Sequence, residues 1–243
     1  MRYLILFMIL VGIFVVGSRS CNGFHFGFGG VRGEGPVKTE NRSANDFHAV
    51  SVEIPGLVEI TVSDRYSVEV QAQENILPLL KTEVENGKLR LYFEENVSQV
   101  KDLKVRISAP AFDELSIGGS GTIKTLSTLN GERLELSIGG SGDIEVPQAE
   151  VGEVRCSIAG SGNIRVGGKT GDVQFEIAGS GDIAAKELVA TTGKVAIAGS
   201  GSVTCNVSQT LKASIAGSGD VYYTGAPSVD TDVSGSGKVK KVD

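Results

Sequence analysis

The residues of this sequence that could do chemistry are a few acids and one arginine at fixed distances after a repeated tripeptide. Asp143, Asp182 and Asp220 each lie two residues after the serine of a Gly-Ser-Gly copy, and Arg165 lies four residues after another. Carboxylates and a guanidinium on one surface can bind a carbohydrate, hold a cation or cleave a polysaccharide. Which of these applies depends on the elements that position them.

The tripeptide Gly-Ser-Gly occurs seven times in the second half of the chain, at spacings of 18 to 21 residues. Its serines are Ser120, Ser141, Ser161, Ser180, Ser200, Ser218 and Ser236. A period in this range is typical of a solenoid, in which each repeat forms one turn, or rung, that packs on the previous one. Because glycine reaches backbone conformations with positive φ, we expect each tripeptide to form a sharp corner.

Apolar and polar residues alternate on both sides of each serine, which predicts two short strands per rung. Three residues before the serine, and again three residues after it, every repeat has Ile or Val. Two residues after the serine the side chain is expected to face outward: Thr122, Asp143, Asn163, Asp182, Ser202, Asp220 and Lys238. The expected fold is an all-β, single-domain, right-handed parallel β-helix with rungs of about 18–21 residues.

A degenerate copy of the repeat lies upstream. Residues 50–62 match residues 134–146 in their apolar and polar order, with Leu57 in place of the serine. Because 63 residues separate Leu57 from Ser120, we expect degenerate rungs over 46–112 and regular rungs over 113–239, within one domain from 46 to 243. Part of residues 31–46 is expected to cover the first rung. The exposed edge of the last rung would carry charge from Lys238, Lys240 and Lys241.

The N-terminus has the features of an export signal. Arg2 precedes an apolar run of signal-core length, and Ser18-Arg19-Ser20 fits a signal-peptidase site, so residues 1–20 are expected to be a signal peptide. Cys21 follows at the position of an acylated lipoprotein cysteine, which leaves free secretion, a lipid anchor on Cys21 and a retained anchor helix as alternatives. The Gly-rich, polar residues 21–45 are expected to form a flexible tether.

Charge and cysteine content exclude other classes. The net charge is −6, with no basic patch interleaved with aromatic residues, which argues against nucleic-acid binding because that binding neutralises phosphates with Lys and Arg. Cys156 and Cys205 should lie two rungs apart, about 10 Å at about 4.8 Å per rung, too far for a disulfide. We expect two free, buried thiols, and no cofactor is indicated.

The corner serines have no evident base for nucleophilic catalysis, because the only histidines, His25 and His48, precede all seven repeats. A structural role is therefore expected for them. Residues 139–143 also depart from the calcium-binding nonapeptide repeat, since the aspartate comes one residue too early and each rung has one copy.

The three aspartates alternate with neutral side chains, as a ladder of stacked acids requires. A weak calcium or carbohydrate site involving Asp143, Arg165, Asp182 and Asp220 is the alternative interpretation. Carboxylates about 10 Å apart cannot share one calcium ion, so such a site would need other ligands.

Several motifs together resemble a known family. They are Cys21 with a Gly-rich spacer, Glu40-Asn41-Arg42 followed by Phe47, Asn86-Gly-Lys-Leu-Arg-Leu91, Val105-Arg-Ile-Ser-Ala-Pro110 and repeated Gly-Ser-Gly-Asp-Ile. Over about residues 40–239 the chain resembles the putative auto-transporter adhesin, head GIN domain family of bacterial envelope proteins. The resemblance implies a β-helical fold and an exported or lipid-anchored location, and it supplies no catalytic residues.

The expected function is that of a non-enzymatic, exported cell-envelope protein with an adhesin-like or scaffold role. Its partner would be an unknown protein or glycan of the envelope, with membrane attachment through a Cys21 lipid. One alternative is a polysaccharide-acting β-helix enzyme that uses Asp143, Arg165 and Asp182. A periplasmic accessory or signalling component is another.

Overall fold

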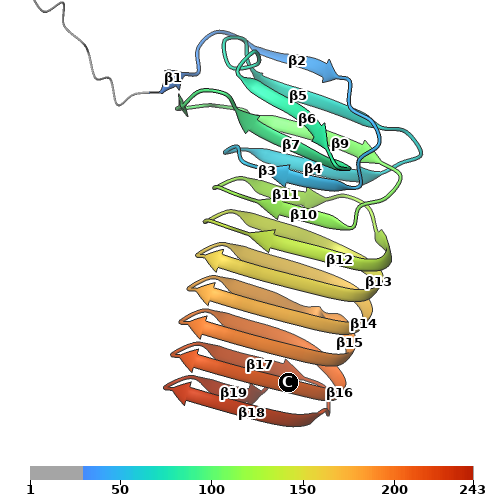
Figure 1. The fold of residues 1–243 in the computed structure, drawn as a ribbon, viewed down its shortest axis with the longest axis vertical. Coiled ribbons are helices and arrows are strands. Elements are labelled where there is room, and N and C mark those ends of the chain that lie inside the picture. The colour runs from blue at the N-terminus through green and yellow to red at the C-terminus, as the bar shows by residue number, and fades with distance from the viewer. Residues whose placement is uncertain (1–29, 243) are drawn as a thin grey trace, which may run out of the picture.

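The structure, a computed structural model, describes residues 30–242 and arranges them as one column of stacked rungs (Figure 1). In this described part there are strands and turns but no helix, so no helix there is long and apolar enough to cross a membrane. The strands are β1 Val31–Arg32, β2 Val37–Arg42, β3 Ala49–Val52, β4 Leu57–Val62, β5 Ser67–Gln73, β6 Leu80–Glu85, β7 Lys88–Phe93, β8 Val97–Ser98, β9 Lys104–Ala109, β10 Glu114–Ile117, β11 Thr122–Thr125, β12 Leu129–Ile138, β13 Asp143–Gly160, β14 Asn163–Gly179, β15 Asp182–Gly199, β16 Ser202–Gly217, β17 Asp220–Thr224, β18 Ser228–Gly235 and β19 Lys238–Lys241.

Parallel pairing between rungs confirms the expected β-helix. From β12 onward each strand pairs with its neighbours in the next rung, with Ile138 beside Ile158 and Ile158 beside Ile177. The Gly-Ser-Gly tripeptides form one edge of the column, where the chain passes from one sheet to the other. Register shifts between Val146 and Ala149 and at equivalent places lie at the opposite edge, where they absorb the variation in rung length.

The alternating apolar residues form a single core between the two sheets. The isoleucines three residues before the serines are almost completely buried, with Ile138, Ile177 and Ile197 each 2% exposed. Val and Ile side chains suit this position because β-branched side chains pack well on a pleated surface.

Two expectations for the upstream region are wrong. Residues 63–112 do not form consecutive rungs, because β10 and β11 pair directly with β3 and β4. The intervening chain is an insertion that packs on β3 and β4 from the side opposite to β10 and β11. Its strands β7 and β9 pair parallel to β3 and β4, while β5 and β6 pair antiparallel to β9 and β7.

The degenerate repeat also aligns two residues away from its expected register. Val50 lies beside Leu115, which lies beside Leu136, and Leu57 lies beside Thr122. Gly56 therefore corresponds to the last glycine of the corner, and Leu57 does not replace the serine. A shift of two residues keeps every apolar side chain inward, so alternation alone could not detect it.

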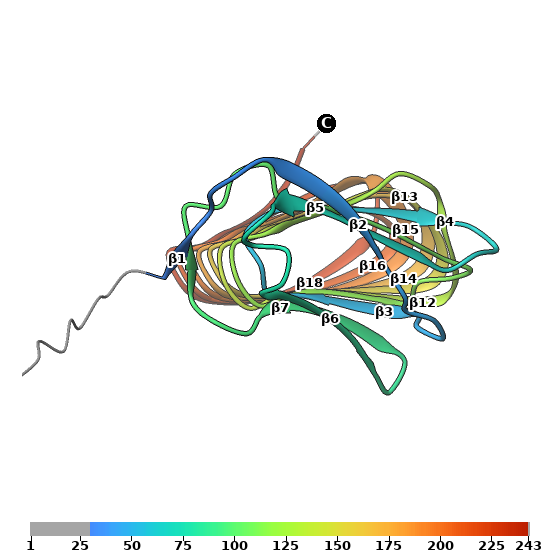
Figure 2. The same cartoon turned by 90° about the horizontal axis from the view of Figure 1, so that it is seen from above.

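The expected tether boundary at residue 45 is corrected as well. Strand β2 pairs antiparallel with β5 from Val37–Gln73 to Arg42–Val68, and β1 pairs with β8. Figure 2 shows β2 and β5 lying across the end of the column. As expected, part of residues 31–46 covers this end, where β2 becomes an edge strand that pairs only with β5 among the described residues. The signal at 1–20, the lipid site at Cys21 and the first part of the tether lie outside the described residues.

Candidate functional site

The column of residues two positions after the serines faces outward, as the sequence predicts. Parallel pairing places Asp143, Asn163 and Asp182 side by side on β13, β14 and β15. The column continues through Ser202 to Asp220. Asp143 and Asp182 are therefore separated by the rung that carries Asn163.

Each aspartate accepts hydrogen bonds from the residue that follows it in the column. Asn163 Nδ2 donates to Asp143 Oδ1 at 2.8 Å. The backbone N and the Oγ of Ser202 donate to Asp182 Oδ1 at 2.9 and 2.6 Å. These bonds join successive rungs and support the interpretation of the acids as a structural ladder.

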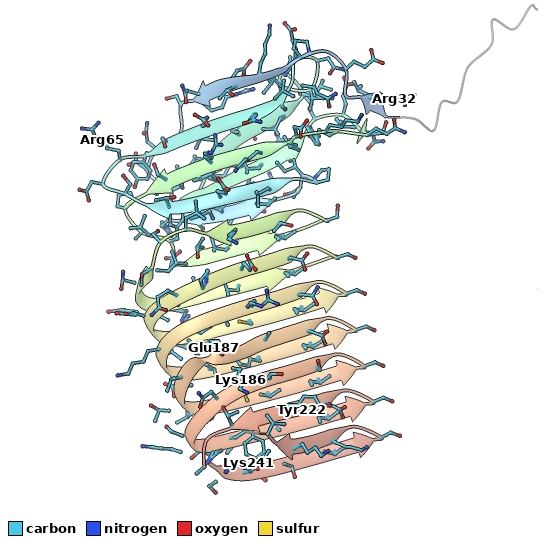
Figure 3. All side chains as sticks on the ribbon, turned by 180° about the vertical axis from the view of Figure 1, so that it is seen from behind. Arg32, Arg65, Lys186, Glu187, Tyr222 and Lys241 are labelled. Atoms are coloured by element: carbon cyan, nitrogen blue, oxygen red, sulfur yellow. The ribbon has the colours of Figure 1, made fainter. Side chains whose placement is uncertain are left out.

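Asp220 continues this pattern at the C-terminal end. The backbone N of Lys238 donates to its Oδ1 at 2.9 Å, and the Tyr222 hydroxyl donates to its Oδ2 at 3.0 Å. The bond to Asp220 stabilises the protonated phenol and so raises the pKa of Tyr222. Figure 3 shows Tyr222 on the column near this end, with Lys241 in the last rung.

A second outward column, four residues after the serines, contains an ion-pair network that the sequence analysis missed. Glu145 Oε2 lies 2.9 Å from Lys124 Nζ, and Glu145 Oε1 lies 3.1 Å from an Arg165 guanidinium nitrogen. The hydrogen bond from Lys124, followed by the charges of Lys124 and Arg165, lowers the pKa of Glu145. The signal was present in the sequence as Lys124, Glu145 and Arg165 at equivalent positions of successive repeats, with alternating charge.

These two columns border a shallow groove, which we call the polar groove. It has a volume of about 540 Å³ and is lined by Thr122, Asp143, Ile144, Glu145, Asn163, Ile164, Arg165, Asp182 and Ala184. The groove brings together three of the four predicted ligand-binding residues, Asp143, Arg165 and Asp182. The fourth, Asp220, lies two rungs beyond Asp182 and is outside it.

The chemistry of the polar groove is hydrogen bonding. It offers three carboxylates, a carboxamide and a guanidinium that is 71% exposed, and one of the carboxylates, Glu145, is ion-paired with this guanidinium. Asp143 and Asp182 are exposed, so water reaches both acids. Within residues 30–242 no three His, Cys, Asp or Glu side chains are placed to hold a metal ion.

Backbone hydrogen bonds connect the corners from rung to rung. The backbone N of Ser161 donates to Gly140 O, and that of Ser200 donates to Gly179 O, each at 2.9 Å. The serine side chains face solvent. His48, the one histidine in the described part of the chain, is bonded through Nδ1 to Asp113 Oδ1 at 2.8 Å.

A second groove, which the sequence analysis did not find, runs along the opposite sheet beside the corners. Its volume is about 670 Å³, and small residues form most of its surface: Ser137, Gly139, Ser157, Ala159, Ala178, Ala196, Ala198, Ser214 and Ala216. We call it the alanine groove. Its lining is mainly apolar, with Glu176 as the one charged side chain.

Cys156 and Cys205, the two cysteines among residues 30–242, are free and buried, as expected. Burial in an apolar environment disfavours the thiolate, so the pKa of Cys205 is raised to about 12 and that of Cys156 is raised well above its ordinary value. The two thiols are part of the core and are not reactive groups of a site.

Comparison with known families identifies the chain. The family model described as "Putative auto-transporter adhesin, head GIN domain" matches residues 46–227. The chain belongs to this family. The resemblance inferred from its motifs is thus confirmed, and the family description is that of an exported, envelope-associated adhesin.

Solved structures share the fold over most of the chain. A putative adhesin from Bacteroides fragilis is 22% identical with a TM-score of 0.81, covering 88% of this chain and 100% of its own. A putative lipid binding protein from Parabacteroides distasonis is 27% identical with a TM-score of 0.74, covering 88% and 99%. A putative adhesin from Parabacteroides merdae is 23% identical with a TM-score of 0.71, covering 88% and 99%. No curated protein matches the chain.

Proposed function

We propose that this GIN-domain protein is a non-enzymatic, adhesin-like component of the cell envelope that binds a glycan in the polar groove. The observation that carries the proposal is the composition of this groove, in which carboxylates, an amide and a guanidinium project from a regular sheet. Such groups can donate to and accept from the hydroxyls of successive sugar units. A protein partner fits less well, because the cores of protein interfaces are depleted of charged residues.

The geometry of the groove favours binding over catalysis. Glycosidases need two carboxylates at a defined separation around the scissile bond. Here Asp143 and Asp182 are held by hydrogen bonds from Asn163 and Ser202. Arg165 is ion-paired with Glu145. The groove is also too shallow to exclude water from a reacting bond.

Binding and turnover should be measured together on a panel of acidic and neutral glycans, with the full chain. We expect a glycan that binds without being cleaved, and Asp182→Ala should weaken its affinity about tenfold. Glu150→Ala provides a matched control, because Glu150 is exposed on the part of β13 away from the corners. Turnover that depends on Asp182 would instead establish the enzyme alternative.

Location requires a separate test. We propose that the chain is exported by its N-terminal segment and anchored by a lipid on Cys21, because Cys21 directly follows the small-residue site Ser18-Arg19-Ser20 that comes after a signal-like apolar run. Labelled palmitate fed to the native host should appear on the chain, and Cys21→Ser should abolish the label. A label that survives this change would contradict Cys21 as the lipid site, and a chain without label would leave free secretion or a retained helix.

The alanine groove favours a second candidate, the binding of an acyl chain. Its floor of exposed alanines is apolar, and one relative of the same fold carries the name of a putative lipid binding protein. Ala178→Trp would fill the groove and should reduce the binding of a fluorescent fatty acid, while Asp182→Ala should leave it unchanged. Fatty-acid binding that Ala178→Trp leaves unchanged and Asp182→Ala reduces would reject this candidate.

A further inference from the structure

The two ends of the column are built differently. At the N-terminal end, β2, β5 and β6 run antiparallel beyond the last parallel rung. The turn between β5 and β6 places Ile76, Leu77 and Leu80 in the core, each at most 2% exposed. Within residues 30–242 both ends have strands that pair on one side only, β2 and β6 at the N-terminal end and β18 and β19 at the C-terminal end. The C-terminal end has no equivalent of the buried Ile76, Leu77 and Leu80 among these residues.

The apolar core of residues 30–242 therefore reaches the surface at the last described rung. Val233 is 40% exposed, whereas Ile215, its equivalent in the previous rung, is 1% exposed. Val229 and Val239 are only partly buried, although their neighbours Leu211 and Val221 are fully buried. The far edges of β18 and β19 also present backbone N–H and C=O groups without a strand partner among residues 30–242. Such an edge is a template for pairing with another chain.

Charge is separated by sign on these two edges. β18 carries Asp230 and Asp232 on its outward side, beside Lys212 and Ser214 of β16. β19 carries Lys238 and Lys240 on its outward side, beside Asp220 and Tyr222 of β17. The last rung thus has one acidic edge and one basic edge.

We propose that two copies of this chain associate tail to tail through the last rung, with β18 of each copy pairing with β19 of the other. β18 runs toward the corner at Ser236 and β19 runs away from it, so the two strands have roughly opposite directions. A two-fold axis along the strands places β18 antiparallel against β19 of the second copy, with acids opposite lysines. A two-fold axis across the strands would place acids opposite acids and lysines opposite lysines, which is unfavourable.

The two-fold symmetry of the contact limits the assembly to two copies. A contact between unlike ends could repeat indefinitely and give a fibre, whereas an isologous contact closes on itself. An interface one rung wide is small compared with the roughly 1,200–2,000 Å² of stable complexes. The dimer should therefore dissociate on dilution and at high salt, because salt screens exposed charges. This inference is independent of the glycan proposal and concerns a different surface.

The test measures molar mass by sedimentation equilibrium for the full chain and for charge-reversed variants. Lys240→Glu and Asp232→Lys are suitable, because their neighbours within the chain, Tyr222 and Ser214, are neutral. Each substitution occurs twice in the dimer by symmetry, so each should weaken association about tenfold or more. The combined Lys240→Glu, Asp232→Lys variant should regain the dimer, and so should an equimolar mixture of the two single variants.

The control is Lys194→Glu, an exposed outward lysine on β15 beside Gln174 and Lys212, which should not affect association. All variants contain residues 1–29, so any self-association through that segment would be the same in each and would not change the comparison. A wild-type monomer at high concentration and low salt would overturn the proposal. So would single variants that still dimerise, or a combined variant that stays monomeric; thermal unfolding checks that each variant is folded.

Discussion

At the scale of single residues, the first glycine of the last five corners combines a positive φ with a close approach to the previous rung. Gly199 has φ +136°, and a Cβ there would lie 2.1 Å from the carbonyl oxygen of Gly179 in the rung below. The neighbouring Ser200 is exposed and contributes its backbone N to the corner ladder. Backbone conformation, and not the serine hydroxyl, therefore sets the requirement for the tripeptide.

Gly199→Ala should destabilise the protein by about 1–3 kcal/mol, from strain at positive φ and from the close contact with Gly179. Ser200→Ala, one residue away, should change stability by less than about 0.5 kcal/mol. The free energy of unfolding in urea measures both effects. Equal effects of the two substitutions would show that the side chain of the serine matters as much as the glycine.

The Lys124–Glu145–Arg165 network predicts a pH dependence. The pKa of Glu145 is lowered in the folded state, so its contribution is present above the unfolded pKa of about 4.3 and is lost as pH falls through the folded value. Glu145→Gln should cost about 0.2–1 kcal/mol at pH 7, because the pair is partly exposed, and almost nothing at pH 2.

Urea unfolding across this pH range provides the measurement for Glu145→Gln, with Glu150→Gln as an exposed control on the same strand. The control should show no such pH dependence relative to the unmodified chain. A cost for Glu145→Gln that stays the same at pH 2 would mean that the carboxylate charge does not stabilise the rung.

At the scale of elements, the insertion between β4 and β10 closes the N-terminal end. Its turn at residues 74–79 contains a backbone hydrogen bond from Leu77 N to Gln73 O, although no helix forms there. The side chains of Ile76 and Leu80 fill the space between the two sheets at the end of the column. The cap thus has two parts. Antiparallel strands β5 and β6 pair with the outer edges of β9 and β7, and the apolar side chains of the turn close the core.

Ile76→Ala should destabilise the protein by about 2–5 kcal/mol, as expected for a cavity in a core that cannot collapse easily. Leu126→Ala, at a side chain that is 55% exposed, should cost far less. Denaturant unfolding compares the two. A small effect of Ile76→Ala would indicate that the cap contributes little to the stability of the rungs beneath it.

At the scale of the whole molecule, each rung contacts mainly its two neighbours, so opening is expected to begin at the less protected end. The C-terminal end lacks a cap among the described residues, and Cys205 on β16 is nearer to it than Cys156 on β13. In mild denaturant a thiol reagent should label Cys205 before Cys156, and neither thiol should react under native conditions. Mass spectrometry of peptides gives the order, and earlier labelling of Cys156 would show that the column opens from the capped end.

The regular part of this protein follows from local features of its sequence. Seven glycine corners and the alternating Ile and Val columns specify the rung length, the inward faces and the outward placement of Asp143, Asn163 and Asp182. These features can be predicted because side-chain alternation and corner spacing are local properties of the sequence. Similar repeats in neighbouring rungs also favour the same register.

The tertiary structure alone decided the irregular part. Alternation with period two is unchanged by a shift of two residues and carries no strand direction, so it could not place Leu57 or reveal the insertion of residues 63–112 between β4 and β10. Their equivalent positions in successive repeats indicate that Arg165 and Glu145 are neighbours, but the ion pair itself depends on side-chain reach as well as register. The open acidic and basic edges of the last rung emerge only when the neighbours of every strand are known.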